Sequence, residues 1–162
     1  MSSPSRVVAL KKSGGTMAFM KGMLNFLSLN FIPRSSDFGL LILRAALGAG
    51  MIYLHGWNKW INFSKYVDAF NDPLNIGKKL SLGLVVFAEV VCSALLIIGF
   101  GTRFAALVLA FTMGVALFVV HKGILSVGET SALYLLGYVI LLIAGPGKFS
   151  FDGGGGGEAK PH

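Results

Sequence analysis

Cysteine and charge are both scarce in this chain. A single cysteine among 162 residues, Cys92, allows neither an internal disulfide nor a CxxC redox pair. Charged residues make up only 13% of the chain, against roughly a quarter in soluble proteins. Hydrophobic residues make up 54%, and the mean hydropathy is +0.73. This composition excludes an ordinary soluble domain and predicts one integral membrane domain.

Acidic residues are few, with 7 Asp and Glu against 14 Lys and Arg and a net charge of +7. The basic residues lie in the tails and between apolar runs, as membrane topology requires, so nucleic acid is not an expected partner. The chain shows no nucleophile–base pair, haem-ligand pattern or dinucleotide loop. Its enzyme status is therefore open, and at most it is a subunit of a membrane oxidoreductase.

Four apolar runs have a length near the roughly 20 residues that a bilayer-spanning helix needs. They are residues 38–57, 80–100, 104–120 and 130–145. Only Gly101-Thr102-Arg103 separates the second run from the third, so these two must be antiparallel neighbours. The expected fold is an all-α, integral membrane, antiparallel four-helix bundle. Its connections are residues 58–79, expected to be a structured surface loop, and residues 121–129.

The chain divides into three parts. Residues 1–36 form a basic tail with an amphipathic helix at about 16–31, which suits either the membrane interface or a partner protein. Residues 37–148 form the membrane domain. Residues 149–162 contain five consecutive glycines and are expected to be a flexible tail.

The distribution of Lys and Arg predicts the orientation of the bundle in the membrane. Four spans place both termini and the Arg103 turn on one side, which carries more basic residues than the side of the two other connections. The bias predicts a multi-pass protein with both termini in the cytoplasm.

Glu89 is the one charge in the run 80–100, and it lies close to the middle. An ionised carboxylate there costs about 3 kcal/mol, so Glu89 must be neutral or paired. The first span has a single polar face, which carries Arg44, His55 and Lys59. Arg44 and His55 are the expected partners of Glu89.

His55, His121 and Glu129 are expected to reach the same membrane face, above Glu89. In the functional interpretation, these four residues line an outward-facing pocket that binds a ligand or relays protons, because ionisable residues inside membranes mark functional sites. Two histidines and two glutamates could ligate a metal, but no HxxxH or ExxH spacing occurs, so no metal-binding residues are assigned.

The alternative interpretation is structural. Arg44 and Glu89 then neutralise each other and set the register of the bundle, while Lys59 and Arg103 anchor the span ends in the interface. Catalytic residues cannot be assigned from the sequence under either interpretation.

A set of sparse polar and small residues in a fixed order runs from residue 38 to 152. It consists of Leu43-Arg44 with Gly48, His55-Gly56 with Lys59, Glu89 with Gly99, Thr102-Arg103, Met113, His121, Glu129, Leu133-Tyr134-Leu135, and Gly145-Pro146-Gly147 with Ser150 and Asp152. Together these residues resemble the DoxX family.

The resemblance implies a small four-helix protein of the bacterial cytoplasmic (inner) membrane. It also implies a quinone-interacting subunit of a membrane oxidoreductase system, with a bound quinone as its cofactor and other membrane protein subunits as partners. A non-catalytic accessory subunit that stabilises a larger electron-transfer complex is the alternative. The fold alone does not decide between the two.

Overall fold

The computed structural model describes residues 17, 19–24, 27 and 35–154. The chain divides into two structural units, Met1–Ser35 and Ser36–His162. In the first unit residues 17, 19–24 and 27 are helical and expose large apolar side chains, among them Phe19 and Leu27. They fall within the expected amphipathic helix, whose two ends lie outside the described residues.

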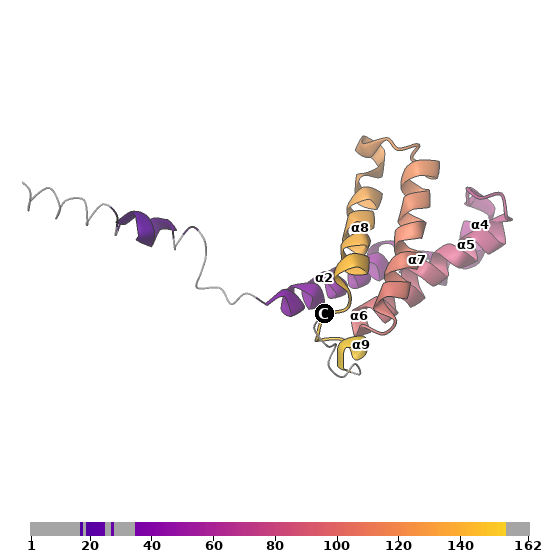
Figure 1. The fold of residues 1–162 in the computed structure, drawn as a ribbon. Helices are drawn as coiled ribbons and strands as arrows, with labels where there is room; N and C mark the ends of the chain where they lie inside the picture. Colours follow the sequence, from indigo (N-terminus) through magenta and orange to yellow (C-terminus); the bar gives the residue numbers. More distant parts are fainter. Residues whose placement is uncertain (1–16, 18, 25–26, 28–34, 155–162) are drawn as a thin grey trace, which may run out of the picture. The chain divides into compact units, whose positions relative to one another are not determined.

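The described part of the second unit is built of helices, three of them short π-helical segments, and contains no strand (Figure 1). The elements in chain order are α2 (Ser36–Met51), η1 (Ile52–Gly56), α3 (Trp57–Ile61), α4 (Phe63–Ala69), α5 (Lys78–Val86), η2 (Phe87–Cys92), α6 (Ser93–Ile98), α7 (Thr102–Val115), η3 (Ala116–Val120), α8 (Leu125–Ala144) and α9 (Phe151–Gly154).

Consecutive helices join into four continuous runs that are long and apolar enough to cross a membrane. These candidate spans are Ser36–Ile61, Lys78–Ile98, Thr102–Val120 and Leu125–Ala144. A helix satisfies its backbone hydrogen bonds within itself, as a chain in hydrocarbon must. The predicted all-α bundle of four membrane helices is confirmed.

The four spans pack around a small apolar core. Helix α7 lies along α8, and α2 packs against α6 (Figure 1). The core side chains, such as Met51, Leu96 and Leu109, are fully buried. Large apolar side chains also point outward, including Phe104 and Phe111, as expected for surfaces that face lipid.

Two connections are shorter than the sequence predicts. The first span continues as helix to Ile61, and the expected loop 58–79 contains α4. The fourth span begins at Leu125, five residues before the expected start. Both differences arise because a hydropathy window ends a span at its polar residues, whereas the helix continues through them into the interface.

Asp72 closes the turn that leads into the second span. Its carboxylate accepts hydrogen bonds from the Ser81 hydroxyl and from the backbone N–H groups of Ile76 and Gly77. These bonds, the one from Ser81 foremost, hold the pKa of Asp72 below its ordinary value. The Asp72 carboxylate is therefore charged near neutral pH, and its oxygens are engaged in these three hydrogen bonds.

Residues 149–154, expected in the flexible tail, are instead held against the bundle. The Asp152 carboxylate accepts hydrogen bonds from the N–H groups of Gly101 (2.9 Å) and Thr102 (2.8 Å) at the start of α7. The Phe149 carbonyl accepts one from Arg44. A carboxylate suits this position because the first N–H groups of a helix lack partners within it. Residues 155–162 lie outside the described part of the chain.

The attachment of this segment is expected to depend on pH through Asp152. Burial raises the pKa of Asp152, but the bonds from Thr102 and Gly101 and the charge of Arg44 outweigh it and leave the pKa below its ordinary value. The carboxylate therefore stabilises the attachment above the unfolded pKa of about 3.9 and loses that effect as the pH falls through the lower folded pKa. A nitroxide label on a cysteine at position 154, with Cys92 replaced by serine, should be immobile at pH 7 and mobile in strong acid.

Asp152→Asn is the matched variant for this measurement. It should give a mobile label at every pH, because the charged acceptor is missing throughout. Equal label mobility in the parent and in Asp152→Asn at pH 7 would show that the carboxylate does not hold the segment.

Candidate functional site

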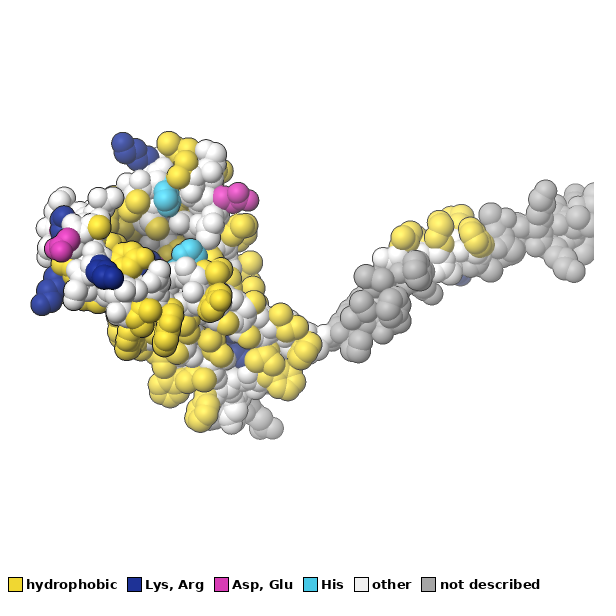
Figure 2. Space-filling model, turned by 180° about the vertical axis from the view of Figure 1, so that it is seen from behind, with side chains coloured by type: hydrophobic (Ala, Val, Ile, Leu, Met, Phe, Trp, Pro, Cys, Tyr) yellow, Lys and Arg dark blue, Asp and Glu magenta, His cyan; other side chains and the backbone are white. Residues whose placement is uncertain are grey.

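A pocket of about 310 Å³ lies where the four spans approach one another. All four contribute to its wall: His55 and Lys59 from the first, Glu89 from the second, Met113 and Ala116 from the third with His121 at its end, and Val127, Thr130 and Ser131 from the fourth. Figure 2 shows the two histidines of the described residues on one face of the helical domain. We refer to this cavity as the Glu89 pocket.

Glu89 is buried and forms an ion pair with Lys59. The Lys59 Nζ atom lies 2.6 Å from both carboxylate oxygens of Glu89. The side chain of Glu89 is 4% exposed and that of Lys59 is 22% exposed. The carboxylate is therefore in the interior, and the lysine lies nearer the mouth of the pocket. The charge compensation that a carboxylate needs at this depth is therefore present.

Arg44 and His55, the expected partners of Glu89, form no hydrogen bond or ion pair with it. Arg44 lies fifteen residues before Lys59, about 22 Å along a helix, which is farther than its side chain extends. It donates instead to the carbonyl oxygens of Leu96 and Phe149 at the other end of the bundle. Arg44 is fully buried, and its two hydrogen bonds link the first span to the second span and to the segment at Phe149.

The three π-helical segments coincide with the site. His55 lies in η1, Glu89 lies in η2, and His121 directly follows η3. A π-turn contains an extra residue, so it rotates the side chains that follow it and opens the helix locally, often at functional sites. These segments help to direct three separate spans into one pocket, and no sequence pattern used above predicts them.

Gly56 allows the first span to approach Glu89 closely. A Cβ atom built on Gly56 would lie 2.7 Å from Cγ2 of Val90 and 3.1 Å from Cβ of Glu89, which is too close for any larger residue. The adjacent His55 ring packs edge-on against Tyr134 of α8, with ring centroids 5.8 Å apart. The close approach of the two spans at Gly56 and the ring contact with Tyr134 together position His55 at the pocket wall.

One residue predicted to line the pocket does not reach it, and Arg103, predicted as an anchor, lies far from it. Glu129 is exposed on α8 and does not line the cavity. Arg103 is exposed at the start of α7, at the opposite end of the third span from His121. The structure adds Thr130 and Ser131 to the pocket wall. A search for charged residues within apolar runs misses both, because their side chains are small and uncharged.

The role of Lys59 as the partner of Glu89 was also missed, although its spacing contains the signal. Lys59 lies four residues after His55, one helical turn on and on the same face. Lys59 therefore lies near the end of the first span, and the pocket opens at that end.

The arrangement provides hydrogen-bond donors and acceptors at one cavity. Lys59 supplies a charged donor, Glu89 supplies an acceptor, and each neutral imidazole carries one donor and one acceptor nitrogen. Within the described residues, no group of three or more His, Cys, Asp and Glu is placed to hold a metal ion. The groups that line the pocket are suited to ligand binding and proton exchange.

Comparisons with known proteins place the chain in one family. The DoxX family model matches residues 39–122, which is half of the chain and includes His55, Glu89 and His121. An uncharacterized protein of Haemophilus influenzae is 31% identical over 132 residues, which cover 76% of this chain and 96% of that protein. No solved structure matches the chain. The family match and the length of the shared sequence show that this chain belongs to the DoxX family.

Proposed function

We propose that the Glu89 pocket binds a quinone headgroup or an equivalent small polar ligand, as part of a membrane oxidoreductase system. The observation that carries the proposal is the convergence of His55, Lys59, Glu89 and His121 from three spans on one cavity. Ionisable side chains are costly inside a membrane, so four of them at one cavity favour a functional site.

The pocket fits such a ligand in size and chemistry. Its volume of about 310 Å³ is at the lower end of the range for small-molecule sites. Lys59 and the two histidines can donate hydrogen bonds to the carbonyl oxygens of a quinone, and Met113 and Ala116 offer apolar contact to its ring. A bound quinone would supply electron exchange coupled to proton uptake and release.

The side chains of this protein would bind the headgroup and supply protons. Lys59 Nζ donates hydrogen bonds to both carboxylate oxygens of Glu89, and a ligand that competes for either partner would change how the two groups share their protons. His55 and His121 are half-buried at the wall, where their ring nitrogens can donate a proton to a bound headgroup or accept one from it.

Replacing the histidines tests this function. His55→Ala and His121→Ala should each leave the protein folded and lower quinone-linked electron transfer in membranes by about 100-fold, the usual contribution of one positioned acid–base group. The measurement is the rate of quinone reduction by membranes that express each variant, normalised to protein content. Lys122→Ala changes an exposed basic residue next to His121 and is the matched control.

The accessory-subunit alternative makes the opposite prediction for the same variants. It needs the apolar faces and the amphipathic segment 16–31, but not the pocket. Wild-type electron transfer in a double histidine variant, with no quinone retained by the purified protein, would contradict the binding proposal. Release of partner proteins on deletion of residues 16–31 would then support the accessory role.

We also propose that the protein lies in the bacterial cytoplasmic membrane with both termini in the cytoplasm, on the basis of the Lys and Arg distribution. The only native cysteine, Cys92, is buried, so it leaves a low labelling background. Single cysteines introduced at Ser13 and at Gly155 should react with a membrane-impermeant thiol reagent only after the cells are opened. Labelling of either position in intact cells would contradict this orientation.

A further inference from the structure

Two buried hydroxyl groups lie behind the Glu89 pocket without a hydrogen-bond partner among the described residues. They belong to Ser93 at the start of α6 and to Tyr138 of α8, and both residues are fully buried. Neither residue lines the pocket. An unpaired buried hydroxyl is costly and rare in folded proteins. The packing of the four spans therefore leaves two hydrogen-bonding groups unused in its interior.

The two hydroxyls lie beside each other and on the inner side of Glu89. The Tyr138 hydroxyl is close to that of Ser93 and interacts with the charge of Glu89. Ser93 follows Glu89 by four residues, about one helical turn, and both are buried in the bundle. Because the second span runs from Glu89 away from the end at which the pocket opens, the hydroxyls lie deeper than the carboxyl group.

The surroundings of the two hydroxyls are closely packed and apolar. Tyr138 belongs to the same buried cluster as Met51 and Leu96. A Cβ atom built on Gly48 would lie 2.8 Å from the carbonyl oxygen of Ser93, so the first span approaches the second without a gap there. Such packing leaves little room for water. The expected partner of the hydroxyls is therefore a neighbouring side chain.

The Glu89 carboxyl group needs different hydrogen bonds in its two protonation states. As a carboxylate it only accepts, and Lys59 Nζ serves both of its oxygens at 2.6 Å. As a neutral acid it must also donate its own proton, and it loses the attraction to the lysine charge. The Ser93 hydroxyl oxygen can accept that proton, and the Tyr138 hydroxyl can donate to the carbonyl oxygen. The two unpaired hydroxyls thus match the neutral form of Glu89.

Other titratable side chains approach Glu89 from its own helix and from neighbouring elements. His55 and His121 line the pocket, on the outer side of the carboxyl group. Tyr134 packs edge-on against His55 and belongs to the same wall. Cys92, in the helix of Glu89 itself, offers only a weakly hydrogen-bonding thiol. These groups can act on the carboxyl from the pocket, and they leave its inner side to the two hydroxyls.

We propose that Ser93 and Tyr138 form an inner site for the Glu89 carboxyl group, which turns there from Lys59 when it takes up a proton. In this step an O–H bond forms on one carboxyl oxygen, the proton comes from water or a ligand in the pocket, and Lys59 keeps its ammonium protons. The proposal rests on the function proposed above for the role of this movement, since the carboxyl would carry a proton away from a ligand. The inner site itself requires no quinone.

Infrared spectroscopy of the purified full chain in detergent at pH 7 tests the inner site. Lys59→Met removes the outer partner, and the Glu89 carboxyl group should then be neutral, because an unpaired charge is unfavourable at this depth. Its C=O stretching band lies apart from the bands of ionised carboxylates and is identified by its loss when Glu89→Gln is added. In the Lys59→Met background, Tyr138→Phe and Ser93→Ala should each shift this band to higher wavenumber, because the carboxyl loses a hydrogen bond.

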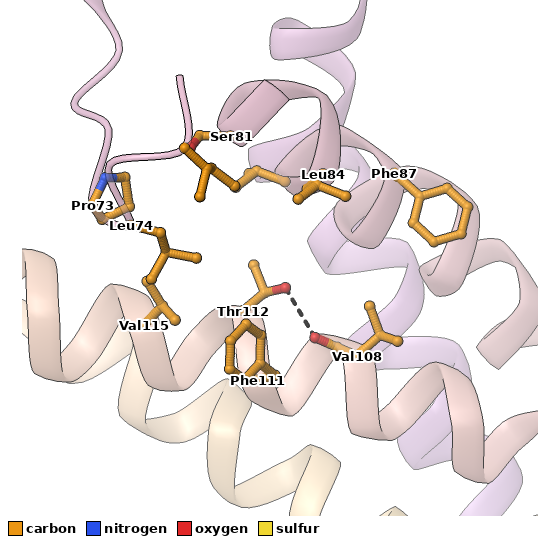
Figure 3. Close-up of a pocket in the computed structure, with 11 residues that line it drawn as sticks. Pro73, Leu74, Ser81, Leu84, Phe87, Val108, Phe111, Thr112 and Val115 are labelled. Carbon is orange, nitrogen blue, oxygen red and sulfur yellow. Dashed lines mark hydrogen bonds between the residues drawn. The ribbon is translucent and has the colours of Figure 1, made fainter. Parts of the chain in front are cut away.

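Two matched variants remove hydroxyls that lie elsewhere, and neither should move the band. Tyr134→Phe is the control for the tyrosine variant, because its hydroxyl lies against the first span, where a Cβ atom built on Gly50 would be 2.6 Å from it. Thr112→Val is the control for the serine variant. Its hydroxyl already donates to the Val108 carbonyl oxygen at 2.9 Å, in an apolar cavity that shares no lining residue with the Glu89 pocket (Figure 3).

A second measurement covers the case in which Lys59→Met does not fold. The infrared difference between acid and neutral pH in protein that keeps Lys59 contains the same band, again assigned by its loss in Glu89→Gln. A band that stays in place in Tyr138→Phe would overturn the proposal, as would equal shifts in Tyr138→Phe and Tyr134→Phe. Because no quinone enters either measurement, failure of the inner site and failure of quinone binding are distinguishable.

Discussion

Replacing Lys59 with methionine is expected to lower the free energy of unfolding by about 3 kcal/mol, because it leaves the Glu89 carboxylate buried without a counter-charge. The value lies at the lower end of the range for broken buried pairs, since Lys59 is partly exposed and water can reach its position. Thermal or denaturant unfolding in detergent, followed by circular dichroism, measures the loss.

Two further variants show whether the pair is responsible. Glu89→Leu combined with Lys59→Met should recover most of the lost stability, because an apolar pair no longer contains an unpaired charge. Lys65→Met removes an exposed lysine in α4 and should change stability by less than about 0.5 kcal/mol. A double variant no more stable than Lys59→Met alone would contradict the ion-pair explanation.

Substituting Gly99 with alanine is expected to cost about 4 kcal/mol and to release the segment 149–154. Gly99 ends the second span with a φ of +75°, and a Cβ atom there would collide with Nη1 of Arg44 and lie 2.5 Å from Cβ of Ser150. The positive φ costs about 1 kcal/mol for a non-glycine residue. The remainder comes from displacing a fully buried arginine and the chain that it binds.

Gly101→Ala is the matched control for the positive φ, and it keeps the backbone N–H that Gly101 donates to Asp152. Gly101 also has a positive φ, +57°, but a Cβ atom there would meet no other atom within 4 Å. It should cost only the backbone strain of about 1 kcal/mol. Amide hydrogen exchange of residues 149–154 should rise in the Gly99 variant and not in the Gly101 variant. Equal exchange in the two variants would refute the collision with Arg44 and Ser150 as the cause.

The number of spans and the nature of the bundle could be predicted from the sequence, because both depend on local properties. A run of about 20 apolar residues has one way to satisfy its backbone in hydrocarbon, and a three-residue connection forces its two helices to be antiparallel. The burial of Glu89 near its counter-charge follows from the same cost of charge in a membrane. His55 and His121 could be assigned to one end of the bundle from helix length alone.

The contacts between spans could not be predicted from the sequence and were revealed only by the tertiary structure. The partner of Glu89 is set by the depth and rotation of two helices, and a π-turn rotates everything that follows it, so an ideal helical wheel cannot choose between Arg44, His55 and Lys59. The same uncertainty placed Glu129 in the pocket, from which its position on α8 excludes it.

The segment 149–154 illustrates the limit of composition as a guide. Its glycines predict flexibility, yet Asp152 reaches the free N–H groups of Gly101 and Thr102, which precede it by about 50 residues. Local sequence determined which residues are helical, apolar or charged. Only the packing of the four spans decided which of those charges and N–H groups meet, because each such contact joins helices that are far apart in the chain.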